Sequence, residues 1–345
     1  MSQKNETTVL VLALLITIGL VSAGVWWFTR GSGSNLERIG QNQSEPLRQS
    51  NSVETFAKVQ NVPSGLFNYG GSTTWAPIRK EVDQAIQTVW PGFQLRYTQP
   101  TSGSPGSGTG IKMLLNNQLA FAQSSRSIEQ QEYQQASQRG FTLKEIPVAI
   151  DGIAIAVNPN LNIPGLTITQ LKDIYIGSLK NWNQVGGPDL PITPYSRRKE
   201  EGGTIEFFVE NVLEGGEFGA NVEFIPTTTQ ALQKLAGNPG GIYYASAPEV
   251  VPQCGIKSVP IGRQANQLVP PYKEPFVPLS QCPAQRNQLN AEAFKSGQYP
   301  ITRRLFVIVK QNGQDDQQAG EVYAKLLLTT QGQEWISKAG FVSIR

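Results

Sequence analysis

Ile146-Pro-Val-Ala-Ile-Asp-Gly-Ile-Ala-Ile-Ala-Val157 is a long apolar stretch that predicts a β-strand. A second apolar strand is predicted at Leu305–Val309, and the two bracket the middle of the folded part of the chain. If they run side by side, they are the two crossings between the lobes of a clamshell; if they lie far apart, this hinge hypothesis fails. Ligands of such α/β folds bind outside the strand ends, where helix N-termini converge.

Around these two strands, helical and extended patterns alternate along the chain. Ala76–Trp90 places Ile78, Val82, Ile86 and Val89 on one helical stripe. Further strands are predicted at Phe93–Thr98, Leu119–Gln123, Lys144–Val157, Gly240–Ala245 and Ile301–Lys310, and helices at Gly110–Gln118, Thr167–Ile176, Thr204–Leu213, Thr227–Ala236, Ala319–Leu328 and Gln331–Lys338. The alternation indicates βαβ units, so we expect a parallel sheet.

Three short stretches rich in Gly, Ser and Thr stand where helices are predicted to begin. They are Tyr69-Gly-Gly-Ser-Thr-Thr-Trp-Ala-Pro77, Ser104-Pro-Gly-Ser-Gly-Thr-Gly-Ile-Lys112 and Arg197-Arg-Lys-Glu-Glu-Gly-Gly-Thr204. Small residues let backbone N–H groups approach a ligand, hydroxyls add donors, and helix N-termini carry partial positive charge. Each stretch therefore suits a tetrahedral oxyanion, although one such stretch alone is more often a plain turn.

The chain of 345 residues contains no histidine, which removes the usual general base and the commonest metal ligand. A Ser-His-Asp hydrolase is excluded, no Gly-x-Ser-x-Gly motif occurs, and Gly106, Gly108 and Gly110 fit neither the P-loop nor the dinucleotide fingerprint. The net charge of +3 includes no basic run interleaved with aromatics, so nucleic acid is not an expected partner. We expect binding without bond chemistry, with no cofactor and no metal.

The N-terminal region contains an apolar run without a charge, Val9–Phe28, which at about 20 residues is long enough to cross a bilayer as a helix. We interpret residues 1–30 as an uncleaved signal anchor with the rest of the chain outside; cleavage after Val21-Ser-Ala23 is the alternative. No cysteine lies near it, so a lipoprotein anchor is excluded. The polar residues 31–58 are interpreted as a flexible tether.

Cys254 and Cys282 are the only cysteines in the chain. In an exported protein, a disulfide between them would close a loop of about 27 residues and stabilise the fold by roughly 3 kcal/mol in the chain-entropy description. Two buried free thiols are the alternative.

Five motifs, in order, resemble those of the phosphate-binding proteins of bacterial ABC phosphate uptake systems. They are Gly71-Ser-Thr-Thr-Trp-Ala-Pro77, Gly106-Ser-Gly-Thr-Gly-Ile-Lys112, Phe121-Ala-Gln-Ser-Ser125, Asp151-Gly-Ile-Ala-Ile-Ala-Val-Asn158 and Arg197–Thr204. The resemblance runs from about Pro63 to the C-terminus. It implies a two-lobed type II periplasmic-binding-protein fold of the α/β class. We expect lobe I to comprise residues 59–155 and 303–345, and lobe II residues 156–302.

The resemblance also implies the binding residues, position by position. Phosphate donors fall on Thr73, Thr74, Ser107, Gly203 and Thr204, the arginine that pairs with phosphate falls on Arg198, and the acid that holds this arginine falls on Glu200. Gly202 stands where the family has a serine, which costs one hydroxyl. Thr74 stands where the family has an aromatic or apolar residue whose backbone N–H binds.

The main departure from the family pattern is Ser125, which stands where many members have an aspartate that accepts the proton of hydrogen phosphate. A carboxylate there rejects fully ionised sulfate, because two acceptors would face each other without a hydrogen between them. We infer that Asp151 supplies the missing acceptor; a turn cap or a pair with Arg126 is the alternative. Arg126 either adds a second cation or points to solvent.

The resemblance implies that the chain binds inorganic phosphate on the periplasmic side of the inner membrane, as an anchored monomer and not as an enzyme. Its partners would be the permease subunits of an ABC-type phosphate importer. Three alternatives remain. The first is a sensor of the same fold that reports phosphate to a membrane kinase, and the second is a receptor for another tetrahedral oxyanion such as sulfate. A phosphatase is disfavoured, because the sequence offers no metal-ligand cluster and no histidine.

Overall fold

The computed structural model describes residues 55–198 and 202–345. The expected anchor at Val9–Phe28, most of the expected tether and Glu200 lie outside these residues. Within the two described ranges, no helix combines the length and the apolar character that crossing a bilayer requires.

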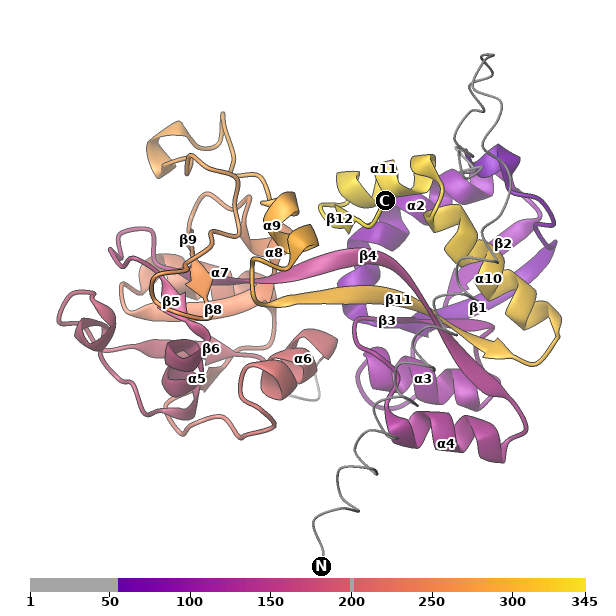
Figure 1. Ribbon diagram of the computed structural model, residues 1–345, viewed down its shortest axis with the longest axis horizontal. Coiled ribbons are helices and arrows are strands. Elements are labelled where there is room, and N and C mark those ends of the chain that lie inside the picture. Colours follow the sequence, from indigo (N-terminus) through magenta and orange to yellow (C-terminus); the bar gives the residue numbers. More distant parts are fainter. Residues whose placement is uncertain (1–54, 199–201) are drawn as a thin grey trace, which may run out of the picture. The chain divides into compact units, whose positions relative to one another are not determined.

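The described elements alternate between strands and helices, as the sequence indicates (Figure 1). The strands are β1 (Gly65–Gly71), β2 (Phe93–Tyr97), β3 (Phe121–Ser124), β4 (Thr142–Val157), β5 (Leu166–Thr167), β6 (Thr193–Ser196), β7 (Glu223–Phe224), β8 (Gly241–Ser246), β9 (Lys257–Val259), β10 (Ile261–Gly262), β11 (Thr302–Gln311) and β12 (Val342–Ser343). The α-helices are α2 (Ala76–Val89), α3 (Ser107–Leu115), α4 (Gln130–Gln138), α5 (Ile168–Ile176), α6 (Gly203–Asn211), α7 (Thr228–Gly237), α8 (Ala247–Val250), α9 (Ala291–Ser296), α10 (Asp315–Leu327) and α11 (Thr330–Lys338). Short 3₁₀ helices lie at Phe56–Lys58, Thr73–Trp75, Trp182–Val185 and Leu279–Gln281.

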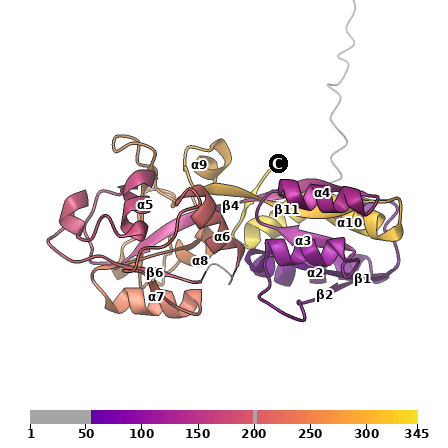
Figure 2. The ribbon, with the colours of Figure 1, turned by 90° about the horizontal axis from the view of Figure 1, so that it is seen from below.

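The two long strands β4 and β11 lie side by side, which confirms the expected pairing of the crossings (Figures 1 and 2). They pair antiparallel from Thr302 opposite Gly152 to Gln311 opposite Thr142. The main path through the sheet is β2-β1-β3-β11-β4-β8-β6-β7. The expectation of a parallel sheet is wrong at the centre of the sheet, where β4 and β11 run antiparallel to their neighbours on this path. On either side of this pair the strands are parallel: β1 pairs with β2 and β3, and β6 pairs with β7 and β8. The chain leaves along β4 and returns along β11, so the two crossings must run in opposite directions.

Separate hydrophobic cores lie at the two ends of this strand pair. We call residues 55–149 and 305–341 lobe I and residues 153–301 lobe II. In lobe I, α2, α10 and α11 cover one face of the sheet while α3 and α4 cover the other (Figure 1). The strand β11 is buried on both faces, with alternate side chains in the two core clusters of lobe I. The strand β4 contributes Val148 and Ala149 to lobe I and Ile153–Val157 to lobe II. The expected boundaries at 155–156 and 302–303 thus fall within strands that join both lobes.

The amphipathic pattern of α2 explains how lobe I is held together. Pro77 stands in the first turn, where its missing N–H costs nothing, and Ile78, Val82 and Ile86 form a stripe with no exposed surface. Burying one such side chain contributes about 1.5–3 kcal/mol relative to leaving it in water. The expectation that Val89 continues this stripe is wrong, because Val89 is the last residue of the helix and is 36% exposed. This stripe fixes the helix that follows the first Gly-Ser-Thr stretch.

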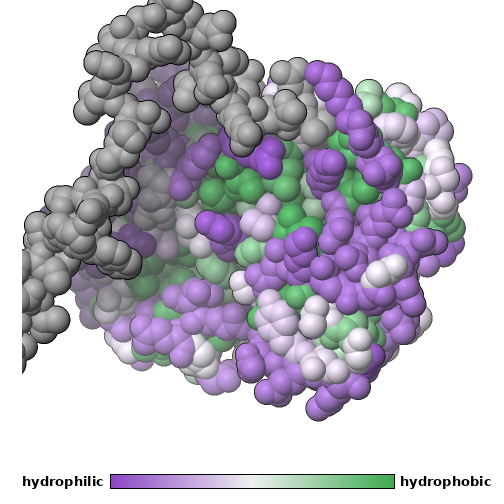
Figure 3. All heavy atoms as spheres, turned by 45° about the vertical axis from the view of Figure 1, so that its right-hand side comes forward, coloured by the Kyte–Doolittle hydropathy of each residue, from purple (hydrophilic) through white to green (hydrophobic). Residues whose placement is uncertain are grey.

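Hydrophilic side chains cover much of the face drawn in Figure 3, and hydrophobic ones show between them. The exposed large apolar residues among those described are spread over different elements: Leu66, Val89, Tyr133, Phe224 and Leu279. Single exposed apolar residues of this kind are normal for a globular surface.

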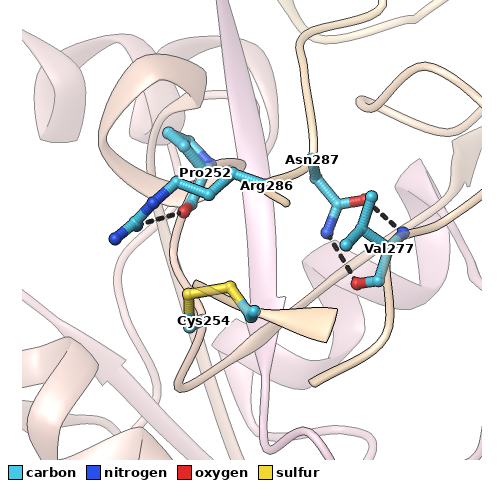
Figure 4. The surroundings of a disulfide bond; sticks show 6 residues. Pro252, Cys254, Val277, Arg286 and Asn287 are labelled. Atoms are coloured by element: carbon cyan, nitrogen blue, oxygen red, sulfur yellow. Dashed lines mark hydrogen bonds between the residues drawn. A yellow bond between two sulfur atoms is a disulfide. The ribbon is translucent and has the colours of Figure 1, made fainter. Parts of the chain in front are cut away.

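Lobe II contains a disulfide between Cys254 and Cys282, whose Cα atoms lie 5.7 Å apart (Figure 4). Hydrogen bonds tie the surrounding loops. The guanidinium of Arg286 donates to the carbonyl of Pro252 at 2.9 Å, and Asn287 bonds both the N–H and the carbonyl of Val277, at 2.8 and 3.2 Å. The disulfide therefore joins two segments of an irregular part of lobe II.

Candidate functional site

Five hydroxyl side chains gather where helices of the two lobes begin. We call Ser72, Thr74, Ser107, Ser125 and Thr204 the hydroxyl cluster. Ser125 Oγ lies 3.0 Å from Ser72 Oγ and 3.2 Å from Ser107 Oγ, and the hydroxyls of Thr74 and Thr204 lie 3.4 Å apart. The three serines have no exposed surface. Thr204 comes from lobe II and the other four from lobe I, so the cluster spans both lobes.

The lobe I part of the cluster is set by close backbone packing. Ser72 follows β1, and Ser107 is the first residue of α3. A β-carbon at Gly110 would lie 2.4 Å from the Cα of Gly71, so only glycine lets α3 approach the end of β1 this closely. The N–H of Ser125, just after β3, donates to Ser107 Oγ at 3.0 Å. The Gly-rich sequence of the second stretch is thereby explained by packing.

Gly203 brings the start of α6, from lobe II, against these serines. A β-carbon at this position would lie 2.7 Å from Ser125 Oγ and 3.0 Å from Ser107 Oγ. Because real β-carbons do not approach other atoms as closely as 2.7 Å, any larger side chain must displace the serine. Glycine at residue 203 therefore lets the start of α6 lie against these serines without displacing them.

Arg303 is the cation at the centre of the site, and the sequence analysis did not select it. It lies on β11 directly opposite Asp151 of β4, and only 5% of its surface is exposed. Its Nε and Nη2 atoms lie 3.0 and 2.8 Å from Asp151 Oδ2. Ser246, at the end of β8, donates to Asp151 Oδ1 at 2.6 Å. Both carboxylate oxygens are thus engaged: Oδ2 holds the guanidinium in one orientation, and the bond from Ser246 to Oδ1 fixes the carboxylate.

The same guanidinium bonds the hydroxyl cluster. Its Nη2 donates to Thr74 Oγ1 and to Thr204 Oγ1, both at 2.9 Å, and its Nη1 donates to the carbonyl of Gly203 at 3.0 Å. Nη1 also lies 3.4 Å from Ser125 Oγ. Arg303 therefore links both lobes and places a buried positive charge beside five hydroxyls and two helix N-termini, an arrangement that suits an oxyanion.

Two carboxyl groups near Arg303 have raised pKa values. Asp151 is buried, which raises its pKa, and Arg303 and the Ser246 hydroxyl oppose this shift. Glu249 on α8 is exposed to solvent at its surface, but partial desolvation of its carboxyl group raises its pKa, and the neighbouring Asp151 charge adds to this rise. Arg197 and Arg303 pull the pKa of Glu249 the other way. The region near Arg303 thus holds two guanidinium groups and two acids.

Comparisons with known proteins agree with this two-lobed arrangement. The family described as a PBP superfamily domain matches residues 41–331. This chain belongs to the PBP superfamily. Among curated relatives, the phosphate-binding protein PstS of Staphylococcus haemolyticus is 27% identical over 277 residues, 79% of each chain. The PstS protein of Staphylococcus aureus is 25% identical over 277 residues, 79% of this chain and 76% of its own.

Solved structures of similar fold include phosphate receptors of bacteria. A putative phosphate ABC transporter substrate-binding protein from Clostridium perfringens, solved with bound phosphate, is similar with a TM-score of 0.63 at 23% identity, over 81% of this chain and 100% of its own. An ABC-type phosphate transport receptor from Vibrio cholerae is similar with a TM-score of 0.61 at 20% identity, over 81% and 99% of the two chains. At these sequence identities, the structural similarity shows only that the chain has this fold.

The predicted arginine, Arg198, is not brought to the hydroxyl cluster of this PBP-superfamily chain. It is exposed, and its guanidinium lies 5.1 Å from the centre of the Phe224 ring on β7, a cation–π contact. Its neighbour Arg197 lies nearer to the predicted site: a β-carbon at Gly202 would be 3.9 Å from Arg197 Nη1 and 3.3 Å from Thr73 Oγ1. The prediction of Arg198 at the cluster is therefore wrong: the guanidinium that lies there belongs to Arg303.

Arg126 points neither to solvent nor to the cluster as a free cation. Its two terminal nitrogens bond both oxygens of Glu132, at 3.0 and 2.8 Å, and Nη2 lies 3.1 Å from Glu129. Its Nε lies 4.0 Å from Glu206 of α6, across the lobe interface. Arg126 is thus committed to carboxylates, and the alternative of a pair with Asp151 does not hold.

A buried polar network supports the first loop from behind. Arg79 donates to the carbonyl of Ser72 at 3.1 Å and to Gln123 Oε1 at 2.9 Å, and Gln123 donates to Tyr323, which bonds Asp83. Burial raises the pKa of Asp83 to about 6. The network therefore fixes the loop that carries Ser72 and Thr74.

Within the described ranges, no cluster of three or more acidic or cysteine side chains could hold a metal ion.

Proposed function

We propose that this chain binds inorganic phosphate between its two lobes and delivers it to the permease of an ABC-type phosphate importer. The observation that carries the proposal is Arg303, a buried guanidinium oriented by Asp151 and bonded to hydroxyls of both lobes. The similarity to PstS phosphate-binding proteins and to phosphate receptors with the same fold supports it. Binding needs no bond chemistry at this site.

Binding would work by hinge motion along β4 and β11. Opening separates Gly203 and Thr204 of lobe II from the serines of lobe I, and phosphate enters between them. On closure, the N–H groups at the starts of α3 and α6 and the cluster hydroxyls donate to the anion, as does Arg303. Each hydrogen bond to a charged ligand contributes about 1.5–3 kcal/mol, and exclusion of water strengthens all of them. Ser107, Ser125, Thr73 and Thr74 are the lobe I donors in this proposal.

The site of action would be the outer face of the membrane. The apolar run Val9–Phe28 and the polar segment after it support an anchored, extracytoplasmic receptor. A tether of this kind keeps the receptor near its permease and raises the effective concentration for delivery. Closure of the lobes would present both of them to the permease together.

A general oxyanion receptor is the second candidate, and one observation favours it. Ser125 offers a hydroxyl that can donate or accept, and both oxygens of Asp151 accept bonds from Arg303 and Ser246. Among the described residues at the cluster, no carboxylate oxygen is therefore free to accept a hydrogen bond from a protonated ligand. Sulfate would meet less opposition here than at a site with a free carboxylate.

Calorimetric titration decides between the two candidates. The full-length chain in a non-ionic detergent is first partly unfolded and refolded to remove bound ligand, and is then titrated with phosphate and with sulfate. We expect phosphate to bind and to be preferred to sulfate. Equal affinity for the two ions would make the chain a general oxyanion receptor, and failure to bind either would refute the proposed function while leaving the fold intact.

The Asp151→Asn variant separates two roles of this carboxylate. Because both oxygens are bonded in the structure, we expect Asp151 to act by orienting Arg303, so that phosphate and sulfate affinities fall together by about tenfold, or about 1.4 kcal/mol. The ratio of the two affinities, measured by calorimetry, is the readout. A loss confined to phosphate would instead show that Asp151 accepts the proton of hydrogen phosphate, as the sequence suggested.

A further inference from the structure

The network behind the loop of Ser72 is a chain of hydrogen bonds whose two ends fix its direction. At one end the guanidinium of Arg79, which can only donate, bonds the Ser72 carbonyl at 3.1 Å and Gln123 Oε1 at 2.9 Å. At the other end the carboxylate of Asp83 can only accept, and Tyr323 donates to its Oδ1 at 2.8 Å. Gln123 Nε2 joins the two ends by donating to the Tyr323 hydroxyl at 3.0 Å. Each group in the chain therefore has one orientation.

Charged or titratable groups of four elements surround Asp83, which is buried. Tyr69 on β1 donates to its Oδ2, and Tyr323 on α10 donates to its Oδ1. Arg79 is the nearby cation on α2 itself, and its guanidinium lies 4.0 Å from the centre of the Tyr97 ring on β2. Burial raises the pKa of Tyr69 and of Tyr323, so both keep their protons and donate. Both oxygens of ionised Asp83 are thus bonded.

We propose that Asp83 is a positioning residue for phosphate binding: its ionised form holds the loop of Ser72 and Thr74 in place, and its protonation releases this loop. The inference rests on the proposed function, because it takes the hydroxyl cluster as the phosphate site. It goes beyond that function by making the affinity for phosphate depend on a group that acts only through the chain described above.

Protonation weakens the chain at whichever oxygen of Asp83 takes the proton. On Oδ1, the carboxyl becomes a donor, so the Tyr323 hydrogen has to turn toward Gln123 Nε2, and two donors meet. On Oδ2, the proton leaves Oδ1 an acceptor without charge, and a hydrogen bond between neutral groups is about half as strong as one to an ion. In both cases Tyr323 holds Gln123 less firmly.

The loop is affected through Gln123 and Arg79. Arg79 Nη1 bonds Gln123 Oε1 and the Ser72 carbonyl together, so a mobile Gln123 amide frees the guanidinium as well. The Ser72 N–H also donates to the backbone carbonyl of Gln123 at 2.8 Å, and Gln123 is two residues before Ser125. The chain therefore ends at two residues of the hydroxyl cluster. If these residues keep the binding arrangement for only about a tenth of the time, the apparent affinity falls about tenfold.

The environment of Asp83 sets the pH range of this effect. Burial raises the pKa of Asp83 to about 6, although the bonds from Tyr69 and Tyr323 and the charge of Arg79 oppose the rise. Asp83 is therefore mainly ionised at about pH 8 and mainly protonated at about pH 5, so the chain should hold the loop at the higher pH and release it at the lower. Phosphate changes its own protonation over this range, so the test compares two proteins at each pH.

Asp83→Asn tests the inference by calorimetric titration of the full-length chain with phosphate at about pH 8 and about pH 5. The amide has the shape of the carboxyl group and carries no charge, so the variant resembles the protonated form at both pH values. We expect the parent to bind about tenfold more tightly than the variant at pH 8 and within about threefold of it at pH 5. The same ratio at both pH values would overturn the inference and leave the proposed function standing. Failure of the parent to bind phosphate would refute the proposed function itself.

Tyr323→Phe tests the path and leaves Asp83 in place. It removes the hydroxyl that joins Asp83 to Gln123, so we expect phosphate affinity at pH 8 to fall about tenfold, with no further loss when it is combined with Asp83→Asn. Tyr175→Phe is the matched control, because Tyr175 is a buried tyrosine of lobe II whose hydroxyl donates to the carbonyl of Tyr195 at 3.1 Å. Losses that add in the double variant, or a Tyr323→Phe affinity equal to that of Tyr175→Phe, would show that Asp83 does not act through this chain.

Discussion

Replacement of Arg303 by lysine is expected to weaken phosphate binding by at least about a hundredfold. The planar guanidinium bonds Thr74, Thr204 and Asp151 at once, whereas an ammonium is a single point of charge that cannot reproduce this fork. Losing two charge-assisted hydrogen bonds of about 1.5 kcal/mol each amounts to about 3 kcal/mol, which corresponds to about two factors of ten in affinity. Calorimetry with phosphate measures the change.

The lysine keeps the charge, so Asp151 retains a counter-ion and the fold should survive. Removing one partner of a buried pair altogether costs about 3–5 kcal/mol, which makes Arg303→Ala the poorer test. Arg96→Lys is the matched control: Arg96 is partly exposed on the strand β2 and bonds Asn68 at 2.7 Å, away from the cluster. Circular dichroism and thermal unfolding check that both variants fold. Phosphate affinity within a few-fold of the parent in Arg303→Lys would remove Arg303 from the binding site.

Replacement of Gly203 by alanine is expected to lower phosphate affinity by about ten- to a hundredfold by holding the lobes apart. The added methyl group would lie 2.7 Å from Ser125 Oγ and 3.0 Å from Ser107 Oγ in the closed arrangement. Core side chains that must shift to accept an extra methyl group cost about 1–3 kcal/mol, and here that cost falls on the closed state alone. Small-angle X-ray scattering with saturating phosphate should therefore show less compaction than in the parent.

Gly237→Ala is the control for adding a methyl group to a helical glycine. Gly237 ends α7, and a β-carbon there would meet no atom within 4 Å. We expect this variant to bind and compact like the parent. If Gly203→Ala behaves in the same way, the two lobes do not close on the ligand through the start of α6, and the hinge mechanism proposed above is wrong.

Most elements could be predicted from periodicity, because their apolar stripes are regular. The helix expected at Ala76–Trp90 is α2, Ala76–Val89, and the strand expected at Phe93–Thr98 is β2, Phe93–Tyr97. The helix α4 was not predicted, since its sequence Gln-Gln-Glu-Tyr-Gln-Gln-Ala-Ser-Gln has no apolar stripe. A capping box formed by Glu129 and Glu132 marks its start, but a glutamate at the N-cap is not part of the usual sequence signature, which has Ser, Thr, Asp or Asn there.

The direction of the central strands could not be read from local pattern. Alternating strands and helices predict parallel pairing, but pairing sense depends on where the chain leaves and re-enters a lobe. The strand β4 continues directly from lobe I into lobe II, and β11 returns beside it. The direction of such crossings depends on the tertiary topology, and the periodicity of apolar residues in helices and strands carries no information about it.

The residues of the hydroxyl cluster could be selected from the sequence, but Arg303 beside them could not be selected from the same motifs. Ser107, Ser125, Thr74 and Thr204 come together, because each stands at a strand end or helix start that the sequence marks. Arg303 was missed because none of the five motifs includes β11, the strand that carries it. Its signal was present: Arg303 and Asp151 are opposite charges on two apolar strands that the hinge hypothesis places side by side, where cross-strand neighbours pair directly.

The position of β11 in the sheet bears on the order in which the protein can fold. It lies between β3 and β4 at the centre of lobe I, yet the ribosome makes it after every other strand except β12. The segments of lobe II are contiguous in the chain, so they can assemble while β3 and β4 still present unpaired edges. Exposed edges of this kind recruit other strands, so the growing chain needs protection from aggregation until its last tenth or so joins the sheet.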